Sequence, residues 1–457
     1  MIGVVWMRIS AWTGFRCPGI GRWLSLAAAL AVSATGGCQP ERPALPSAAA
    51  PVVVHVGPSV QDRIDGLDAA IAADGSVHLV WRQSPGVYGN GIHPSPRLGY
   101  RRGHGDPLHW EAPMELGNIT GVPRVVAASD GMHVFAGSRL DHWWLPAGAG
   151  RWLPQPALLG DHSPPATDFD VAAIDDGLML AYTSGGATAD QSLRIVRWRK
   201  GQAGPAVPLV RHRASARGDA GGFVRLHDPV LAWRDERLLL LWGMRVGSRT
   251  ERNVRLESRV YAAWSTGGSG WTRPAIVTGA GAEGDVADLA AGVAGPSPLA
   301  LFVARGLFVS RWNGDAWSPP RRLATHDVGE LAGSTRAVRV AAGSCAGRPL
   351  VAWVDGRHRG SDRRWWNPLG GFPWSDSPDW ANNDLFVLEG GELAAALEGQ
   401  PATPRRQTAA GGYVADMAVV DRGDHALLVW TGRASVRKSP TDMDAPPTIW
   451  QRRVDCD

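Results

Sequence analysis

One pattern recurs along almost the whole chain and constrains its fold more than any other feature. Each copy reads as an aspartate, a short apolar strand, an Asp-Gly-like turn, a strand ending in tryptophan, a variable loop, a third strand, a glycine turn and Trp-x-x-Pro-x-x-Leu. Six copies occupy residues 67–116, 124–159, 169–210, 227–277, 285–323 and 336–397. Serial strand-rich units of about 40–60 residues predict a single repeat protein.

The two ends of the repeat region complement each other. A seventh unit, residues 415–454, stops after its third strand, whereas residues 50–60, APVVVHVGPSV, have the strand-then-proline form that ends the other units. Four-stranded units in series are typical of an all-β β-propeller. We therefore expect seven four-stranded blades in a ring closed by the N-terminal strand, or six blades if one weak unit is an elaborated loop.

Composition excludes some classes of function. The chain of 457 residues has 22 tryptophans, and their recurrence within the units assigns most of them to packing between blades. Three of the 47 basic residues and none of the 43 acidic residues lie before residue 38, so the remaining chain is almost neutral. This balance gives no support to a nucleic-acid partner. The sequence also has no Gly-rich phosphate loop, Ser/His/Asp signature or zinc-ligand spacing.

The N-terminal segment has the features of an export signal. Three arginines precede residue 23, and the apolar run WLSLAAALAVSAT at 23–35 is too short for a mature membrane span. The following TGGCQP resembles the bacterial lipoprotein signal, in which Cys38 would become the lipidated N-terminus. A plain signal peptide cut nearby is the alternative. Gln39 after the cysteine would imply sorting to the outer membrane.

These features divide the chain into three parts. We expect a lipoprotein-type signal peptide at 1–37, a Pro/Ala tether at 38–50 and a single β-propeller at 51–457. The membrane would then be reached only through the N-terminal lipid. The expected location is the cell envelope, with the protein anchored to the outer membrane on its periplasmic side or at the cell surface.

The repeat pattern, and LVAWVDGRHRG followed by NNDLFVL, resemble the sialidase (neuraminidase-repeat) superfamily of propellers over residues 51–457. That family's Asp box, Ser-x-Asp-x-Gly-x-x-Trp, is represented only by Ser265–Trp271 and by NGDAW at 313–317. Its early Arg-Ile-Pro appears as Arg63-Ile64-Asp65. The resemblance implies a site in which clustered arginines bind a substrate carboxylate in two-point geometry.

Blade positions select the residues of that expected site. Arg63, Arg225 and Arg336 would point to the axis, although each could instead pair with a loop aspartate in a solvated network. Tyr413 stands where the family has its tyrosine nucleophile, and Glu283 could be the base that activates it. Chance placement of Tyr413 and Glu283 is the alternative.

Other candidates come from the axial ends of the strands. Asp68, Asp170, Asp228, Asp288 and Asp416 each begin an innermost strand. Their recurrence favours a structural role, in which they accept backbone N–H groups from the adjacent loop. Asp65 and His227 depart from this pattern and are therefore better catalytic candidates.

Loop lengths predict which face carries a site. Loops at 83–98, 211–226, 243–258, 354–384, 400–415 and 431–447 are long and would share one face, whereas the opposite turns are short. The longest loop carries five large aromatic residues beside charged ones. We expect Trp365 or Trp366, with Arg363 or Arg364, to contact a ligand, unless the aromatics form a small satellite core.

Two cysteines lie in repeat positions that share the short-turn face. Cys345 follows the first strand of blade six and Cys456 follows the third strand of blade seven, and export implies an oxidising compartment. We therefore expect a Cys345–Cys456 disulfide. We expect no metal or cofactor, although DGRHRGSD and SDSPDWANND leave a structural calcium open.

The sequence supports two classes of function. The first is a monomeric envelope protein that binds acidic glycans and cleaves them as a sialidase-like glycoside hydrolase or a polysaccharide lyase. The second is a non-catalytic lipoprotein that binds a glycan or an envelope protein partner on the same face. The sequence does not decide whether the protein is an enzyme, since a shared fold alone does not carry a shared reaction.

Overall fold

The computed structural model describes residues 50–456 with gaps. The residues outside the description are 87–93, 161–162, 187–189, 200, 213–222, 235, 250–253, 269, 279–285, 287, 295–296, 305, 324–338, 356–383, 401, 409–412 and 434–444. The chain divides into two compact units, Met1–Pro43 and Ala44–Asp457, and every described residue lies in the second. Of the helices in this described part, none combines the length and the apolar character needed to cross a bilayer.

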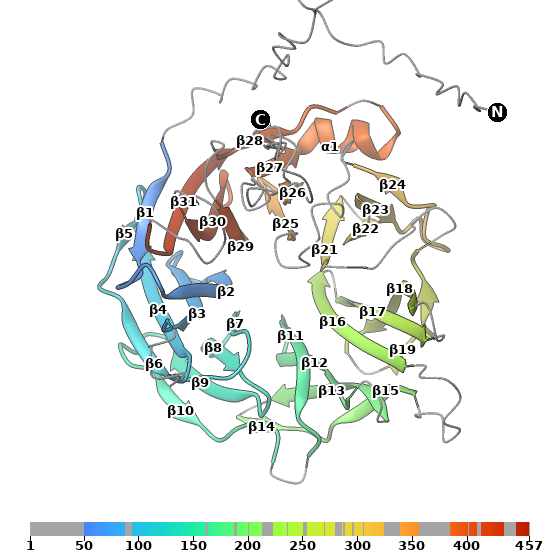
Figure 1. The fold of residues 1–457 in the computed structure, drawn as a ribbon, viewed down its shortest axis with the longest axis horizontal. Helices are drawn as coiled ribbons and strands as arrows, with labels where there is room; N and C mark the ends of the chain where they lie inside the picture. Colours follow the sequence, from blue (N-terminus) through green and yellow to red (C-terminus); the bar gives the residue numbers. More distant parts are fainter. Residues whose placement is uncertain are drawn as a thin grey trace, which may run out of the picture. The chain divides into compact units, whose positions relative to one another are not determined.

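The described strands form seven antiparallel sheets, which are the blades of a β-propeller (Figure 1). The innermost strands are β2 (Arg63–Ile71), β7 (Arg124–Ala128), β11 (Ala166–Ile174), β16 (Phe223–Arg234), β21 (Asp288–Ala294), β25 (Val340–Cys345) and β29 (Tyr413–Asp421). Each contacts the next around the axis, and β29 contacts β2. The predicted all-β fold with seven blades is confirmed.

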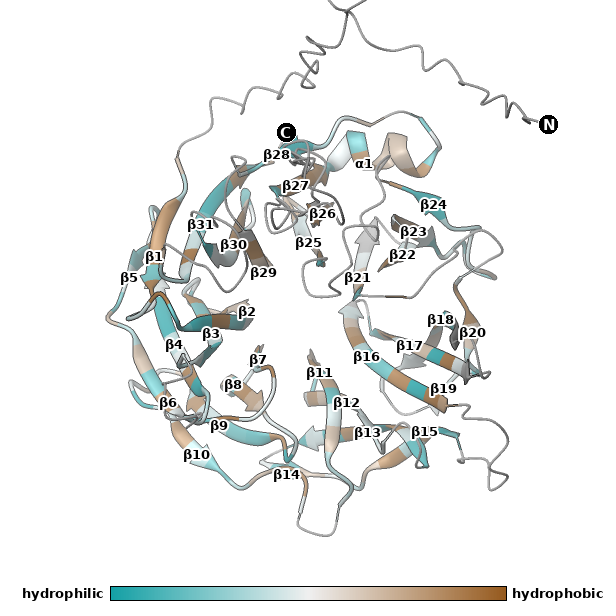
Figure 2. Cartoon of the chain, in the orientation of Figure 1, coloured by the Kyte–Doolittle hydropathy of each residue, from teal (hydrophilic) through white to brown (hydrophobic). Residues whose placement is uncertain are grey.

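The second and third strands of each blade continue outward from the axis. The second strands are β3 (Val77–Ser84), β8 (Gly131–Ala136), β12 (Gly177–Ser184), β17 (Arg237–Arg249), β22 (Ser297–Val303), β26 (Arg348–Asp355) and β30 (His425–Arg433). The third strands are β4 (Arg97–His104), β9 (Asp141–Pro146), β13 (Gln191–Arg199), β18 (Val254–Thr266), β23 (Leu307–Arg311), β27 (Asp384–Glu389) and β31 (Thr448–Asp455). Hydrophobic and hydrophilic residues both occur along strands such as β16 (Figure 2). The first half of β17 is instead continuously apolar, from Leu238 to Trp242, as expected of a strand that is buried on both faces.

The outermost position is filled by short segments, often after a proline. These are β5 (His109–Trp110), β6 (Met114–Asn118), β10 (Leu153–Gln155), β14 (Gln202–Ala203), β15 (Val207–His212), β19 (Gly270–Trp271), β20 (Ala275–Ile276), β24 (Arg321–Arg322) and β28 (Arg405–Arg406). In the seventh blade, β1 (Val52–Val56) takes this position by pairing antiparallel with β31. That sheet therefore combines residues from the beginning and the end of the propeller.

Two predicted segments have a different structure. The segment GGELAAAL, expected to continue the strands of blade six, forms helix α1 (Gly390–Leu397), since its alanine and leucine residues favour a helix. The expected loop at 243–258 is largely strand, because β17 extends to Arg249 and β18 begins at Val254. Blade four therefore projects a longer β-hairpin than the loop pattern predicts.

Tryptophans within the second strands lie in the hydrophobic interior of the propeller. Trp81, Trp242 and Trp353 are fully buried and belong to three separate hydrophobic clusters. The cluster around Trp81 combines residues of the first and seventh blades, including Val420 and Leu427. Their burial confirms that these tryptophans are packing residues.

Candidate functional site

The innermost strands carry a ring of aspartates around the axis. Asp288 begins β21 as predicted, whereas the other four lie within their strands, because those strands start several residues earlier than the repeat indicates. Four of the five ring aspartates accept a backbone N–H from the innermost strand of a neighbouring blade at 2.7–3.0 Å: Asp68 from Val125, Asp170 from Leu231, Asp288 from Val340 and Asp416 from Leu67. The expected structural role of these four aspartates is confirmed, although their donors lie in neighbouring strands rather than in loops. Each bond ties one blade to another.

The second and sixth blades have no aspartate at the corresponding position. There Arg124 and Arg339 take part in the ring instead. The Arg124 guanidinium lies 3.3 Å from the Asp170 carboxylate. Arg339 lies 3.8 Å from Asp288 and 3.7 Å from Asp416. Guanidinium groups thus offset part of the negative charge at the axis.

The ring surrounds a cavity of about 710 Å³. Loop residues 120–122 and 137–138 also line it, so it extends to the face at which the innermost strands begin, which we call the entry face. Burial raises the pKa of Asp68 to about 6, against the opposing charge of Arg124. Burial likewise raises the pKa of Asp288 to about 7, although Arg339 opposes the shift.

Asp228 differs from the other ring aspartates. Its backbone has φ of 47°, in the left-handed region, which none of the other four ring aspartates adopts. Its Oδ2 lies 2.9 Å from Nδ1 of His227, which donates the hydrogen bond. Burial alone would raise the pKa of Asp228, but the hydrogen bond from His227, with the charges of Arg339 and Arg225, lowers it overall. Asp228 is thus held by the side chain of His227, whereas backbone N–H groups hold the other four aspartates.

Asp168 lies two residues before Asp170 on β11 and also lines the cavity. Its side chain is 27% exposed, its Oδ2 has no hydrogen-bond partner among the described residues, and Arg225 Nη2 is 3.9 Å away. Burial and the nearby Asp228 carboxylate raise the pKa of Asp168. Asp168 and Asp228 thus have pKa values shifted in opposite directions, which suits one to donate and the other to accept a proton.

His227 lies beneath this pair rather than in the cavity. The residue is 4% exposed, and its ring packs against Gly243, where a Cβ atom would overlap it. It is not among the cavity-lining residues. The structure therefore favours a positioning role, in which His227 holds the Asp228 carboxylate.

The other described candidates lie at the strand starts of blades one and four. Arg82 holds Asp65 with two hydrogen bonds of 2.6 and 2.8 Å, and Arg63 lies 3.6 Å from the same carboxylate. Asp65 is not among the residues that line the cavity. The side chains of Arg63 and Arg225 are 60% and 50% exposed. Of these candidates, Arg225 is the one that lies near the Asp168–Asp228 pair.

The remaining candidates cannot be placed. The described residues do not include Glu283, Arg336, Arg363, Arg364, Trp365, Trp366, Cys38 or the side chain of Tyr413. Most of the two segments considered for calcium also lies outside them. The sequence interpretation missed Asp168, although its i, i+2 spacing from Asp170 places both side chains on one face of a strand and could have identified it.

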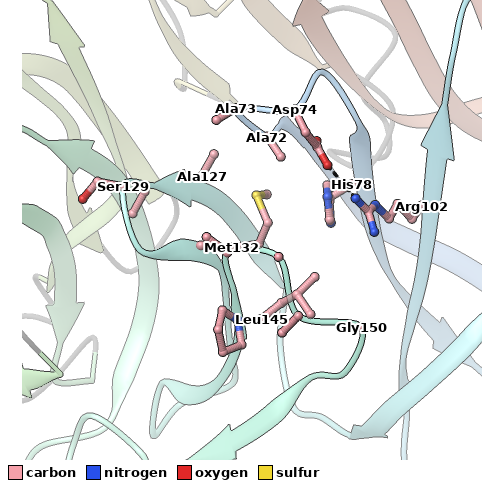
Figure 3. A pocket seen from close by; sticks show the side chains of 16 residues that line it. Ala72, Ala73, Asp74, His78, Arg102, Ala127, Ser129, Met132, Leu145 and Gly150 are labelled. Atoms are coloured by element: carbon pink, nitrogen blue, oxygen red, sulfur yellow. Dashed lines mark hydrogen bonds and ion pairs between the residues drawn. The ribbon is translucent and has the colours of Figure 1, made fainter.

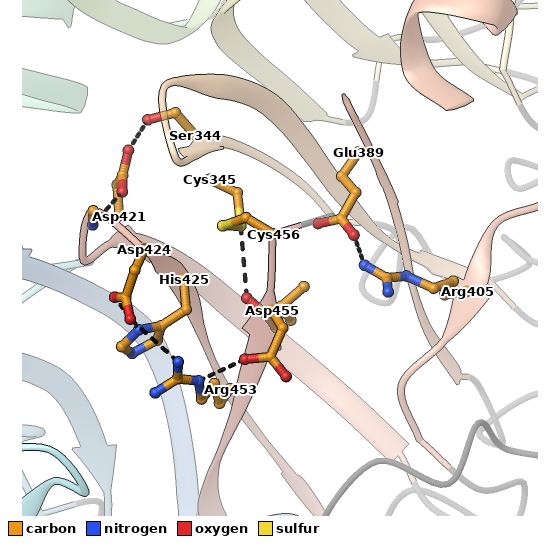
Figure 4. The surroundings of a disulfide bond; sticks show 12 residues. Ser344, Cys345, Glu389, Arg405, Asp421, Asp424, His425, Arg453, Asp455 and Cys456 are labelled. Carbon is orange, nitrogen blue, oxygen red and sulfur yellow. Dashed lines mark hydrogen bonds and ion pairs between the residues drawn. A yellow bond between two sulfur atoms is a disulfide. The ribbon is translucent and has the colours of Figure 1, made fainter. Parts of the chain in front are cut away.

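One described cluster has metal-ligand chemistry but already pairs with a cation. Atoms of Asp106, Asp424 and His425 lie within 4.8 Å of one another. The Arg453 guanidinium contacts Asp424 at 3.3 Å and also pairs with Asp455 (Figure 4). It contacts Asp106 at 3.0 Å as well. The guanidinium supplies positive charge to these carboxylates, so the cluster is a surface ion-pair network.

Next to this network, Cys345 and Cys456 form a disulfide with their Cα atoms 5.4 Å apart (Figure 4). This is the pair that the sequence predicts. Their separation of 111 residues means that the bond links the end of β25 to the C-terminal end of the chain. It therefore fastens the seventh blade to the sixth.

Comparisons with known proteins extend the fold assignment. No protein-family model matches the chain, and no curated protein matches it. It is similar to a solved structure titled as a polysaccharide lyase of a new family, PL25 ulvan lyase, with 11% identity, a TM-score of 0.52 and coverage of 89% of this chain and 94% of that one. The structure of the same lyase bound to -[GlcA(1-4)Rha3S]- is 11% identical with a TM-score of 0.52, and the match covers 88% of this chain and 94% of that one. A protein of unknown function from Dyadobacter fermentans DSM 18053 is 12% identical with a TM-score of 0.48, and the match covers 90% of this chain and 99% of that one. At these identities the lyase likeness shows a common β-propeller fold.

Proposed function

We propose that this protein is an acidic-glycan-cleaving β-propeller whose site is the entry-face end of the axial cavity. The observation that carries the proposal is the carboxyl pair Asp168 and Asp228, which lines this cavity with oppositely shifted pKa values. Such a division between two acids is typical of sites that run acid and base steps at one pH. Binding of a polysaccharide by the solved ulvan lyase motivates the substrate class but does not carry the assignment.

Each residue of the pair has a distinct role. Asp168 holds a proton at higher pH than an ordinary aspartate and donates it to the leaving oxygen of the glycosidic bond. Asp228, kept ionised by His227 and the nearby guanidinium groups, accepts a proton from water or from the sugar carbon next to a uronate carboxylate. Arg225, exposed and 3.9 Å from Asp168, binds that carboxylate.

A glycan array tests binding and cleavage together. The full chain is applied to acidic and neutral polysaccharides, and both retained protein and released fragments are measured. We expect retention on uronate polysaccharides, with an about tenfold or larger loss of affinity for Arg225→Met, because a charge-assisted hydrogen bond is lost. Asp168→Asn should keep retention and lose about 10²–10⁴-fold of the cleavage rate.

A matched control lies at the opposite end of the same blade. Asp176→Asn removes a carboxylate that pairs with Arg197 on the far side of blade three, away from the cavity. It should leave both readouts unchanged. Retention without any product from the unmodified protein would contradict the enzyme and leave a binding protein.

The binding protein is the second candidate, and one observation favours it. Four of the ring carboxylates are already committed to backbone N–H groups, so the inner part of the cavity serves the fold. The exposed Arg63 and Arg225 would then hold an acidic glycan or an acidic protein surface without chemistry. The array distinguishes the two candidates by product.

We further propose that the protein is exported as a monomer and anchored to the outer membrane through lipidated Cys38. The motivation is the TGGCQP segment and the disulfide, a bond that persists in oxidising compartments. Labelling cells with a fatty-acid analogue should mark the wild-type protein and not Cys38→Ser. Label on both proteins, or on neither, would contradict the anchor.

A further inference from the structure

A second cavity lies between the first and second blades, at the ends of their strands opposite the entry face. Its volume is about 360 Å³, and its walls include the turn at 72–74, the strand end at 127–129 and the turn at 146–150 (Figure 3). We call this face, where the innermost strands end in short turns, the turn face. None of the acidic-pair residues of the proposed glycan site lines this cavity.

The walls are mainly apolar and made of small residues. Alanine and glycine predominate, and Met132 and Leu145 supply the larger surfaces (Figure 3). Asp74, His78 and Arg102 lie together along one side (Figure 3). The cavity therefore suits a ligand that is apolar over most of its surface and polar at one point.

At the polar side, hydrogen bonds hold the Asp74 carboxylate and the Arg102 guanidinium together. Asp74 accepts Ser76 N–H at 2.9 Å and the Ser76 hydroxyl at 2.6 Å through Oδ1, and Arg102 Nη2 at 2.6 Å through Oδ2. Arg102 Nε is buried and has no hydrogen-bond partner among the described residues, while the Arg102 side chain as a whole is 25% exposed. The Arg102 guanidinium is thus held in place by Asp74 while part of its donor capacity stays unused.

His78 is committed and uncharged. Its Nε2 lies 2.9 Å from the Ser76 hydroxyl, and its Nδ1 lies 2.9 Å from the Tyr100 hydroxyl. Burial, reinforced by the charge of Arg102, lowers the pKa of His78 to about 4. At neutral pH the polar side therefore carries one positive and one negative charge, which compensate each other.

This charge balance selects the ligand class. An anion would meet the Asp74 carboxylate, and a cation would have to compete with Arg102 and Ser76 for the Asp74 oxygens. A neutral molecule with one acceptor oxygen meets neither penalty and can accept from Arg102. We propose that this cavity binds a small, uncharged, mainly apolar molecule, such as an aromatic ketone, with its oxygen at the Arg102 guanidinium.

Ligand-observed NMR titration of the full chain with acetophenone tests the proposal. We expect saturable binding with a dissociation constant on the order of 1 mM for a ligand of this size. Benzoate and benzylamine, which keep the ring but carry a charge, should bind about tenfold more weakly or not at all. Arg102→Met should weaken acetophenone binding about fivefold, as expected for one lost hydrogen bond.

Two further variants test whether binding takes place in this cavity. Gly150→Phe should weaken or abolish binding without removing Arg102, because Gly150 lines the cavity and a Cβ there meets no atom within 4 Å, which leaves room for the new ring. Arg197→Met is the matched control, since Arg197 forms the same arginine–turn pair with Asp176 at a smaller cavity of about 240 Å³. It should leave acetophenone binding unchanged. Absence of saturation, equal binding by Gly150→Phe, or loss with Arg197→Met instead of Arg102→Met would each overturn the proposal.

Discussion

Aspartates that occupy similar places in the repeat have different chemistry at the axis. Asp288 and Asp228 occupy the same position of the repeat, yet burial raises the pKa of Asp288 whereas the hydrogen bond from His227 helps to lower that of Asp228. The repeat predicted the shared position and the structural role of four of them. It could not predict the exception, because the left-handed backbone at Asp228, with φ of 47°, and the hydrogen bond from His227 arise only in the folded chain.

Asp288 gives a prediction about stability and pH. Its pKa is about 7 in the folded protein against an ordinary value of 3.8, so the folded state holds its proton more tightly than the unfolded state. That contribution to stability is present at low pH and is lost as the pH rises towards 7. The melting temperature of Asp288→Asn should therefore rise relative to wild type between about pH 5 and pH 8.

Asp74 provides the control of opposite sign. Hydrogen bonds from Ser76, together with Arg102, lower its pKa to about 2. Its contribution is present above its ordinary pKa and is lost as the pH falls towards 2, so Asp74→Asn should differ from wild type by a constant amount between pH 5 and pH 8. A pH-independent difference for Asp288→Asn over the same range would contradict the account.

At the scale of strands, the sequence pattern predicted the elements best where the repeat is regular. The seven innermost strands, the second strands with their tryptophans and the disulfide positions follow from the repeat. Helix α1 and the long β17–β18 hairpin do not, because local composition and an insertion replace the repeat pattern there. Much of the predicted loop site, including Trp365 and Trp366, stays a prediction because it lies outside the described residues.

The packing of second strands against third strands can be tested at Gly99. This residue pairs with Trp81 across β3 and β4, and a Cβ atom there would overlap the buried indole. Gly99→Ala should destabilise the protein by about 1–3 kcal/mol, as overpacked cores do. Urea unfolding measures this, with Gly270→Ala as the control because a Cβ at Gly270 meets no atom within 4 Å. Equal unfolding midpoints for Gly99→Ala and wild type would show that the interface is not tightly packed.

At the scale of the whole molecule, two long-range links connect distant parts of the chain. Strand β1 lies in one sheet with β29, β30 and β31, and the disulfide joins residues 111 positions apart. Replacing both Cys345 and Cys456 by alanine should lower the free energy of unfolding by about 2–5 kcal/mol, since an open unfolded chain has more conformational entropy. Reductant should shift the urea midpoint of wild type and not that of the double variant. No shift in wild type would contradict the expected contribution.

The pH dependence of cleavage tests the central claim most directly. The kcat/KM for a uronate polysaccharide retained on the array is measured against pH for wild type, Asp168→Asn and Asp228→Asn. The account predicts that the wild-type rate rises as Asp228 loses its proton and falls as Asp168 loses its proton, with each variant reduced by about 10²–10⁴-fold. Cleavage by both variants at the wild-type rate and with the wild-type pH profile would contradict it.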